Sequence, residues 1–458
     1  MSMPHKGAKE KSGGKAPASS ASKEAPKPAK RSSTASSAAL LAIGDEVLAG
    51  EIGNANAAFL SARLSEAGLP VREHTVVSDD AAAIKSALVR LQKEVDVIIV
   101  TGGLGPTEDD RTIDVVSDLL TVEAIPHAPS LEAMKKRFSA HGFELTPNNL
   151  RQVRVPKGAE ALPNGAGIAP GFRVEMGNAE AFFLPGVPRE MERIYLDHVG
   201  PRLAKLLEKA GVPAPLIRTW HVYGMGESHI DHRLAGLLDA VPGASLHFRT
   251  DHPENHVKVV LRGPDPAKLK ETLDRIDVEV RKRIGAGIYG IDDETFPMAV
   301  ARTLRAGGAT LMLAESCTGG YAGEIITSEP GATDFFLGSV VCYSNELKVN
   351  VLGVKQATID EHGAVSELCA KEMADGAKRI SNATVAVAIT GVAGSSKDGS
   401  PTPAVATPAG EKPVGTVCFA LAGPKSTKTS SKFFTGGRER IRRAAAYAAL
   451  ELARKQFA

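Results

Sequence analysis

Two patterns of apolar and polar residues alternate along most of this chain. Short apolar runs, such as 39–43 and 95–100, predict buried strands, and segments with apolar residues three and four positions apart, such as 57–67, predict amphipathic helices. Strands that alternate with helices in this way are typical of a parallel sheet covered on both faces. We therefore predict an α/β domain over residues 39–207. Its other predicted elements are 71–77, 81–94, 113–120, 130–141 and 181–184.

The same alternation of strand and helix patterns recurs over residues 296–458, after a segment with a different pattern. Residues 213–291 hold two short strand patterns, joined by the turn-forming segment 251–255 and followed by a helix pattern. The predicted fold class is therefore α/β, with two sheet domains joined by a small α+β domain. In the last domain we predict helices at 297–306, 319–327, 366–380 and 437–456, and strands at 309–314, 338–342, 384–390 and 414–421.

The first 38 residues differ from the rest of the chain. They contain no Val, Ile, Leu or Phe, so they cannot bury enough surface to offset their ordering entropy, and we predict a disordered tail over 1–38. The tail carries eight Lys or Arg and two Glu, whereas the remaining residues carry 47 basic and 51 acidic side chains. Because this body is net acidic and only 5% of the chain is aromatic, a nucleic-acid groove is not indicated.

The overall composition is that of a globular protein: 458 residues, 43% hydrophobic and 24% charged, enough for two to three domains. No run approaches the roughly 18–20 apolar residues that span a bilayer, and the amino terminus lacks the apolar core of a secretory signal. The four cysteines have no C-x-x-C spacing, and we interpret them as reduced thiols of a cytoplasmic protein. They are Cys317, Cys342, Cys369 and Cys418.

A glycine-rich loop follows the predicted strand at 95–100, with the sequence Thr101-Gly-Gly-Leu-Gly-Pro-Thr-Glu-Asp-Asp-Arg-Thr112. Backbone N–H groups at Gly102, Gly103 and Gly105 can face an anion, and the next helix start adds a favourable potential. Carboxylates and a bound phosphate repel each other, so their presence in one loop makes chemical sense if a Mg²⁺ ion lies between the carboxylates and the phosphate. A glycine-rich turn whose acidic residues cap the helix explains the same pattern.

Acidic pairs also follow the first two predicted strands, in Gly44-Asp-Glu46 and Ser78-Asp-Asp80. The carboxyl ends of parallel strands meet at one edge of a sheet. We therefore expect these carboxylates to lie near the glycine-rich loop.

Ser316 lies in a strand-to-helix turn, Ala314-Glu-Ser-Cys-Thr-Gly-Gly320, which is where α/β enzymes place nucleophiles. A helix N-cap is the alternative interpretation. The segment Tyr343-Ser-Asn-Glu-Leu-Lys348 supplies a candidate base, since desolvation lowers the pKa of a lysine, and a tyrosine that can orient it. Thr390 follows another apolar strand and is expected at the same crevice.

Arg438 opens the last predicted helix, and Arg442 follows one turn later. A guanidinium at this position suits a substrate phosphate. Each residue taken singly also has a structural explanation, such as a solvated helix face or a cap. Their gathering at the strand ends of one sheet favours a site.

Four segments of the first domain resemble the molybdopterin-binding-like domain of the CinA (competence/damage-inducible) family. They are Ile43-Gly-Asp-Glu46, Gly102-Gly-Leu-Gly-Pro-Thr-Glu-Asp-Asp110, Ala169-Pro-Gly-Phe172 and Leu184-Pro-Gly-Val-Pro188. The resemblance implies an ADP-ribose pyrophosphatase that yields AMP and ribose 5-phosphate and uses Mg²⁺ and K⁺. The residues it implies are Asp79 and Asp110 for catalysis and metal, Asp45 as a third metal ligand, and Gly102, Gly103, Gly105 and Thr107 for substrate binding.

Five segments of the last domain resemble the carboxy-terminal CinA domain, a nicotinamide mononucleotide (NMN) deamidase. They are Ala314-Glu-Ser-Cys-Thr-Gly-Gly320, Tyr343-Ser-Asn-Glu-Leu-Lys348, Gly363-Ala-Val-Ser366, Thr390-Gly-Val-Ala-Gly394 and Lys412-Pro-Val-Gly-Thr416. The resemblance implies a homodimer and a reaction without cofactor. The residues it implies are Ser316, Tyr343, Lys348 and Thr390 for catalysis, Arg438 and Arg442 for the phosphate, and Gly319, Gly320, Gly391 and Gly394 around the substrate. The segment 395–410 is longer and richer in Pro and Ala than the family pattern, which bears on the lid of the pocket.

The interpretation that unites these features is a bifunctional enzyme of pyridine-nucleotide salvage. Two alternatives stay open from the sequence. The first domain can instead handle a molybdopterin-type pterin, or the chain can be a non-catalytic accessory protein of competence or DNA repair. The net acidic body argues against direct DNA contact.

Overall fold

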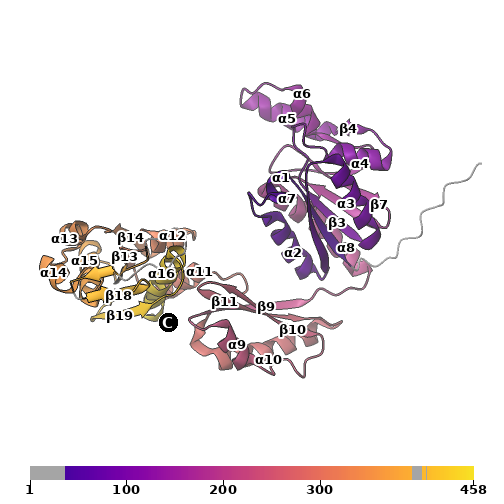
Figure 1. Ribbon diagram of the computed structural model, residues 1–458. Coiled ribbons are helices and arrows are strands. Elements are labelled where there is room, and N and C mark those ends of the chain that lie inside the picture. Colours follow the sequence, from indigo (N-terminus) through magenta and orange to yellow (C-terminus); the bar gives the residue numbers. More distant parts are fainter. Residues whose placement is uncertain (1–36, 395–404, 409, 458) are drawn as a thin grey trace, which may run out of the picture. The chain divides into compact units, whose positions relative to one another are not determined.

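The computed structural model describes residues 37–394, 405–408 and 410–457 (Figure 1). The chain forms two compact units, and the boundary between them falls after Val212. The predicted tail at 1–38 and the lengthened segment at 395–410 lie largely outside the described residues.

The first unit is built on a six-stranded sheet with the order β2-β1-β3-β8-β7-β6. Strands β2, β1, β3 and β8 run parallel, as the α/β rhythm predicts. The prediction of a parallel sheet is wrong for the other edge, where β7 joins β8 through a tight turn at Gly177 (φ 56°) and β6 joins β7 antiparallel. The strands are β1 (Ala38–Ile43), β2 (Val71–Val77), β3 (Val97–Thr101), β6 (Glu160–Leu162), β7 (Gly171–Met176) and β8 (Ala179–Leu184).

Strand β1 is buried on both faces, as its uninterrupted apolar sequence predicts. Leu41 packs into one hydrophobic cluster with the buried faces of α3 and α4, and Leu40 packs into another with α2, α7 and α8. Helices therefore cover both faces of this sheet. They are α1 (Asp45–Leu48), α2 (Ala55–Ala67), α3 (Ala81–Glu94), α4 (Thr112–Leu120), α7 (Pro188–Ile194) and α8 (Gly200–Lys209), with a π-helical turn over Tyr195–Val199.

A small excursion, β4 (Ala124–Pro126), α5 (Ala128–Ala140), α6 (Pro147–Arg151) and β5 (Arg154–Pro156), lies at one end of this unit (Figure 1). Its two strands pair antiparallel, and Arg154 forms an ion pair with Asp114 of α4 at 3.1 Å. Helix α5 buries only one residue, Met134. The excursion is thus attached to α4 near β5, while most of α5 is exposed.

The second unit begins with a small domain of four antiparallel strands in the order β10-β11-β9-β12. The only tryptophan of the chain, Trp220, is fully buried beneath its helices and donates from Nε1 to Asp277 at 2.7 Å. The elements are β9 (Leu216–Tyr223), α9 (Glu227–Leu234), β10 (Ala244–Asp251), β11 (Glu254–Leu261), α10 (Pro266–Ile284) and β12 (Ile288–Ile291). The predicted α+β domain is therefore present, with two more strands than the sequence patterns indicate.

The last domain has a five-stranded sheet with the order β14-β13-β15-β18-β19. The first three strands run parallel, whereas β18 and β19 are antiparallel. The predicted fold class, two α/β domains joined by a small α+β domain, is confirmed. The strands are β13 (Leu311–Glu315), β14 (Phe336–Val341), β15 (Val385–Gly391), β18 (Thr416–Ala422) and β19 (Thr427–Phe433), with a separate hairpin of β16 (Val405–Thr407) and β17 (Gly410–Lys412). The helices are α11 (Phe296–Ala306), α12 (Tyr321–Thr327), α13 (Asn345–Leu352), α14 (Gln356–His362), α15 (Glu367–Ser381) and α16 (Arg438–Lys455).

Helix α16 joins the last domain to the β10–β11 hairpin of the small domain. Arg443 forms an ion pair with Asp251 at 3.1 Å, and the Tyr447 hydroxyl donates to the buried Glu254 carboxylate at 3.3 Å. The Tyr447 ring also stacks on Phe296, with 4.7 Å between ring centroids. Burial raises the pKa of Glu254 even though two tyrosines donate to its carboxylate.

Candidate active site

Ser316 lies directly after β13, at the carboxyl edge of the parallel part of the last sheet. Its backbone N–H donates to the carbonyl of Ile389 on the neighbouring strand at 2.9 Å. The chain then turns sharply through Gly319 (φ 62°) and Gly320 (φ 95°) into α12. A side chain at either glycine would strain this turn, so the two glycines are what allow the serine to sit at the crevice.

The Lys348 side chain comes from α13 and ends beside this serine. Its Nζ lies 3.1 Å from the Ser316 Oγ, 3.0 Å from the Cys342 carbonyl and 3.1 Å from the Tyr343 carbonyl. Lys348 is 1% exposed, and its burial lowers the pKa of the ammonium group. In the neutral state the amine donates its two hydrogens to the two carbonyls, which leaves its lone pair facing the serine hydroxyl.

Glu315 is a member of this site that the sequence interpretation missed. Its fully buried carboxylate accepts hydrogen bonds from the backbone N–H groups of Gly320 (3.0 Å), Ala322 (3.1 Å) and Gly323 (2.9 Å), and from the Ser339 hydroxyl (2.8 Å). Glu315 therefore connects the turn after Ser316 with the start of α12 and with β14. The available signal was an acidic residue at the end of an otherwise apolar strand, because such a residue is buried only where donors surround it.

The Tyr343 and Thr390 side chains do not contact the Ser316 hydroxyl. Tyr343 is 60% exposed, and its hydroxyl accepts a hydrogen bond from Arg438 at 3.3 Å. The Thr390 hydroxyl is buried and donates to the Ala364 carbonyl at 2.8 Å. Tyr343 reaches the lysine through its backbone carbonyl, a contact that no side-chain pattern reveals.

The two predicted phosphate-binding arginines lie on the same helix, α16, and contact two different loops at this edge of the sheet. Arg438 donates to the Gly394 carbonyl at 2.5 Å, and Arg442 donates to the Thr318 carbonyl at 2.7 Å. Gly391 is required for packing, because a Cβ there would lie 2.8 Å from the Thr416 carbonyl oxygen. The structure thus brings Ser316, Lys348, the glycine turn and both arginines to one edge of the sheet.

Cys317 follows the serine and is the competing nucleophile to consider. All four cysteines of the chain are free and buried. Burial raises the pKa of the Cys317 thiol to about 12, so the reactive thiolate is absent at neutral pH. Among the groups in this turn, the serine hydroxyl is the one with a base beside it.

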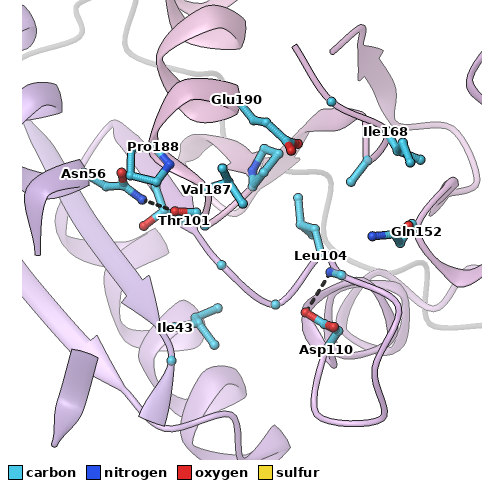
Figure 2. A pocket seen from close by; sticks show the side chains of 18 of the residues that line it. Ile43, Asn56, Thr101, Leu104, Asp110, Gln152, Ile168, Val187, Pro188 and Glu190 are labelled. Atoms are coloured by element: carbon cyan, nitrogen blue, oxygen red, sulfur yellow. Dashed lines mark hydrogen bonds between the residues drawn. The ribbon is translucent and has the colours of Figure 1, made fainter. Parts of the chain in front are cut away.

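The first unit holds a cavity of about 860 Å³ at the carboxyl ends of its parallel strands (Figure 2). The predicted Gly102, Gly103 and Gly105 all line it, together with Gly44 and Gly186 from two other loops. Close packing explains two of these glycines. A Cβ at Gly102 would lie 2.1 Å from the Ile43 carbonyl oxygen, and one at Gly103 would lie 2.1 Å from the Thr112 Oγ1.

The acidic residues predicted for this cavity have different positions. Asp110 lines the cavity and accepts from the Gly105 N–H at 2.7 Å (Figure 2). Its carboxylate also accepts from the Thr107 N–H and hydroxyl at 2.9 and 2.5 Å, so it holds the shape of the loop. Asp79 lines the cavity and accepts the Asp45 N–H at 2.9 Å. Asp45 and Thr107 themselves do not line the cavity, whereas Glu46 does.

The Asp79 carboxyl has a raised pKa, which results from partial burial and from the nearby Asp45, Glu46 and Asp109 carboxylates. A cation would relieve this repulsion. Among the described residues, however, no three His, Cys, Asp or Glu side chains are grouped to hold a metal ion. The donor set therefore fits Mg²⁺ that arrives with substrate phosphates, because Mg²⁺ binds through one or two protein carboxylates, water and phosphate oxygens.

Three family descriptions match consecutive parts of the chain. They are "Probable molybdopterin binding domain" over residues 39–205, "Damage-inducible protein CinA KH domain" over 217–290, and "CinA C-terminal domain" over 293–457. These matches and the folds define a three-domain α/β protein of the competence/damage-inducible class.

Relatives that match over most of this chain carry the same family name. A CinA-like protein of Anaeromyxobacter sp. (strain Fw109-5) is 41% identical over 417 residues, which cover 91% of this chain and 98% of the relative. A CinA-like protein of Myxococcus xanthus is 36% identical and covers 91% of this chain and 97% of the relative. The chain therefore belongs to the CinA family.

Solved structures of single domains also match. A competence-damaged protein (CinA) superfamily protein from Klebsiella pneumoniae is 34% identical, with a TM-score of 0.31, and the match covers 35% of this chain and 95% of that one. Within the described part of the chain, no helix is both long and apolar enough to cross a bilayer.

Proposed function

We propose that the last domain is an amidohydrolase that converts the carboxamide of NMN to the carboxylate and releases ammonia. The observation that carries this proposal is the 3.1 Å contact between the Lys348 amine and the Ser316 hydroxyl, in a setting that favours the neutral amine. An amide needs a strong nucleophile and a returned proton, because nitrogen is a poor leaving group. A serine–lysine pair supplies both.

The reaction proceeds in two steps. The Lys348 amine takes the Ser316 proton while Oγ attacks the amide carbon, and the resulting ammonium returns that proton to the departing nitrogen, which leaves as ammonia. Water then adds to the ester on Ser316 with the amine again acting as base, and the carboxylate is released. In the turn after Ser316, the Gly319 and Gly320 N–H groups already donate to the Ser316 carbonyl and to Glu315, so the Cys317 and Thr318 N–H groups are the candidates for stabilising the oxyanion. Arg438 and Arg442 provide positive charge for the substrate phosphate.

Activity should depend on pH through Lys348. Because only the neutral amine accepts the serine proton, kcat/KM for NMN should rise with pH and level off above the pKa of Lys348, which burial places below 10.5. A steady-state profile from pH 5 to 10 measures this. Lys348→Arg is the control, since a guanidinium stays protonated and should be inactive throughout. An arginine variant with substantial activity would contradict the assignment.

We further propose that the first domain hydrolyses the diphosphate of ADP-ribose to AMP and ribose 5-phosphate. Three features support the proposal: a cavity lined by backbone of three glycine-rich loops, the carboxylates Glu46 and Asp79 at its rim, and the size of the cavity. Mg²⁺ held by these carboxylates would neutralise diphosphate charge. Asp110 also lines the cavity, and its carboxylate fixes the Gly105–Thr107 part of the loop.

Gly103→Ala should lower the rate of ADP-ribose hydrolysis by about 100-fold. The new Cβ would lie 2.1 Å from the Thr112 Oγ1, at a residue with a φ of 66°, so the loop must shift, and a 1 Å misplacement costs rates of that order. AMP formation measures the effect. Gly165→Ala is the matched control, because its Cβ would meet nothing closer than 3.9 Å. Equal losses in both variants would mean that loop geometry is not the cause.

One assay separates the proposals from their alternatives. The full chain is incubated with NMN, or with ADP-ribose and Mg²⁺, and the products are identified by mass spectrometry. Absence of AMP from the ADP-ribose reaction would favour a pterin-handling first domain. Absence of both reactions would favour a non-catalytic accessory protein.

A further inference from the structure

We propose that three aromatic rings of the α5 excursion, Phe138, His141 and Phe143, form a subsite for the purine ring of a nucleotide whose phosphates lie on the glycine-rich loop. This inference rests on the proposed hydrolysis of ADP-ribose and adds the part of the protein that recognises the base. All three rings line the same cavity as Gly102, Gly103 and Gly105.

The rings form an ordered aromatic wall. Phe143 and His141 are stacked, with 6.0 Å between centroids and 9° between ring planes, and Phe138 meets Phe143 edge to face at 6.1 Å. The His141 Nδ1 donates to the Arg137 carbonyl at 2.8 Å, which holds this ring in place and leaves Nε2 as an acceptor in the neutral imidazole. The geometry is therefore set before any ligand arrives.

The wall is not explained by core packing. Phe143 is 66% exposed, and α5, the helix that carries Phe138, buries only Met134. Both residues therefore contribute little to the hydrophobic core of the unit. A flat heteroaromatic ring that covers the exposed Phe143 face would remove apolar surface from water and gain stacking energy.

The lining of the cavity combines two kinds of chemistry that a nucleotide requires. In the glycine-rich loop the Gly102 and Gly105 N–H groups already donate to the Leu184 carbonyl and to Asp110, so the Gly103 N–H is the candidate of this loop for a phosphate contact. The excursion offers rings and the Arg137 guanidinium, which also lines the cavity. A purine nucleotide carries its flat ring and its phosphates at opposite ends of one ribose. The purine base of the substrate is therefore assigned to the rings of Phe138, His141 and Phe143.

The test is the binding of AMP and of ribose 5-phosphate to the full chain with Mg²⁺, measured by isothermal titration calorimetry. Phe143→Ala should weaken AMP binding by about 10- to 100-fold, the range for loss of one base–aromatic stack, while ribose 5-phosphate binding stays unchanged. Phe143→Tyr should restore AMP binding, because it keeps the ring. Phe433→Ala, which removes a phenylalanine of 61% exposure in the last domain, is the matched control and should bind like the parent.

Equal AMP affinity in the parent and in Phe143→Ala would overturn the subsite, as would a parent that binds no AMP. A pterin monophosphate that binds the parent more tightly than AMP would overturn the choice of purine. If the parent binds AMP through Phe143 but does not cleave ADP-ribose, the subsite stands and the hydrolase proposal fails.

Discussion

Ser316→Ala should abolish NMN deamidation, with kcat falling by a factor on the order of 10⁵ or to background. The variant keeps the lysine and the arginines but has no atom that can form the acyl intermediate, and losses of this size follow removal of a serine nucleophile. Ammonia release and product mass measure the effect. Ser316 is almost buried and contributes one hydroxyl, so the fold should be preserved.

Two comparisons make the result specific. A double variant, Ser316→Ala with Lys348→Met, should be no slower than the single variant, because nucleophile and base act as one unit. Hydrolysis of ADP-ribose should be unchanged in both, because Ser316 belongs to the second compact unit. Parent-like deamidation by Ser316→Ala would show that another group forms the intermediate.

Glu315→Ala should have the largest effect on stability, lowering the free energy of unfolding by about 3 kcal/mol or more. Three backbone N–H groups and the Ser339 hydroxyl lose their acceptor, and each buried unsatisfied donor costs about 1–3 kcal/mol. Urea unfolding followed by Trp220 fluorescence measures the effect, because the only tryptophan lies in the same compact unit.

The matched control is Glu361→Ala, since the side chain of Glu361 is 74% exposed and its loss should change stability by no more than about 0.5 kcal/mol. Glu315→Gln should lie between the two, because it keeps one acceptor oxygen but turns an NH₂ group toward donors. A Glu315→Ala protein as stable as the control would mean that the turn rearranges to satisfy its own N–H groups.

The meeting of Ser316 and Lys348 at one crevice could be predicted because the positions of both depend on local patterns. A buried strand followed by a small-residue turn predicts the place of Ser316, and parallel topology brings the ends of β13, β14 and β15 to one edge. The sequence does not say which atoms of a residue matter. The sequence predicts that the Tyr343 side chain orients Lys348, whereas in the structure it is the Tyr343 backbone carbonyl that contacts the lysine.

Elements and roles that depend on distant pairing were harder to predict. Strand β6 has only three residues, and both β6 and β7 join the sheet antiparallel, so the alternation of strands and helices gave no signal for them. Asp110 is predicted as a metal ligand and does line the cavity, but the sequence gives no sign that both of its carboxylate oxygens also accept backbone N–H groups of its own loop. Competition between local and ligand contacts is settled by loop conformation, which spacing along a chain does not encode.

Helix α16 sets a practical limit on how the protein can be divided. A fragment that starts at Phe296 would uncover an aromatic stack that is buried in the intact chain, and it would leave Arg443 without its carboxylate partner. The same helix carries Arg442, which donates to the Thr318 carbonyl in the turn after Ser316, and Arg438, which donates to the Gly394 carbonyl. The natural starting point for expressing the last domain as a fragment is therefore Pro213, so that the small domain still covers the buried side of α16.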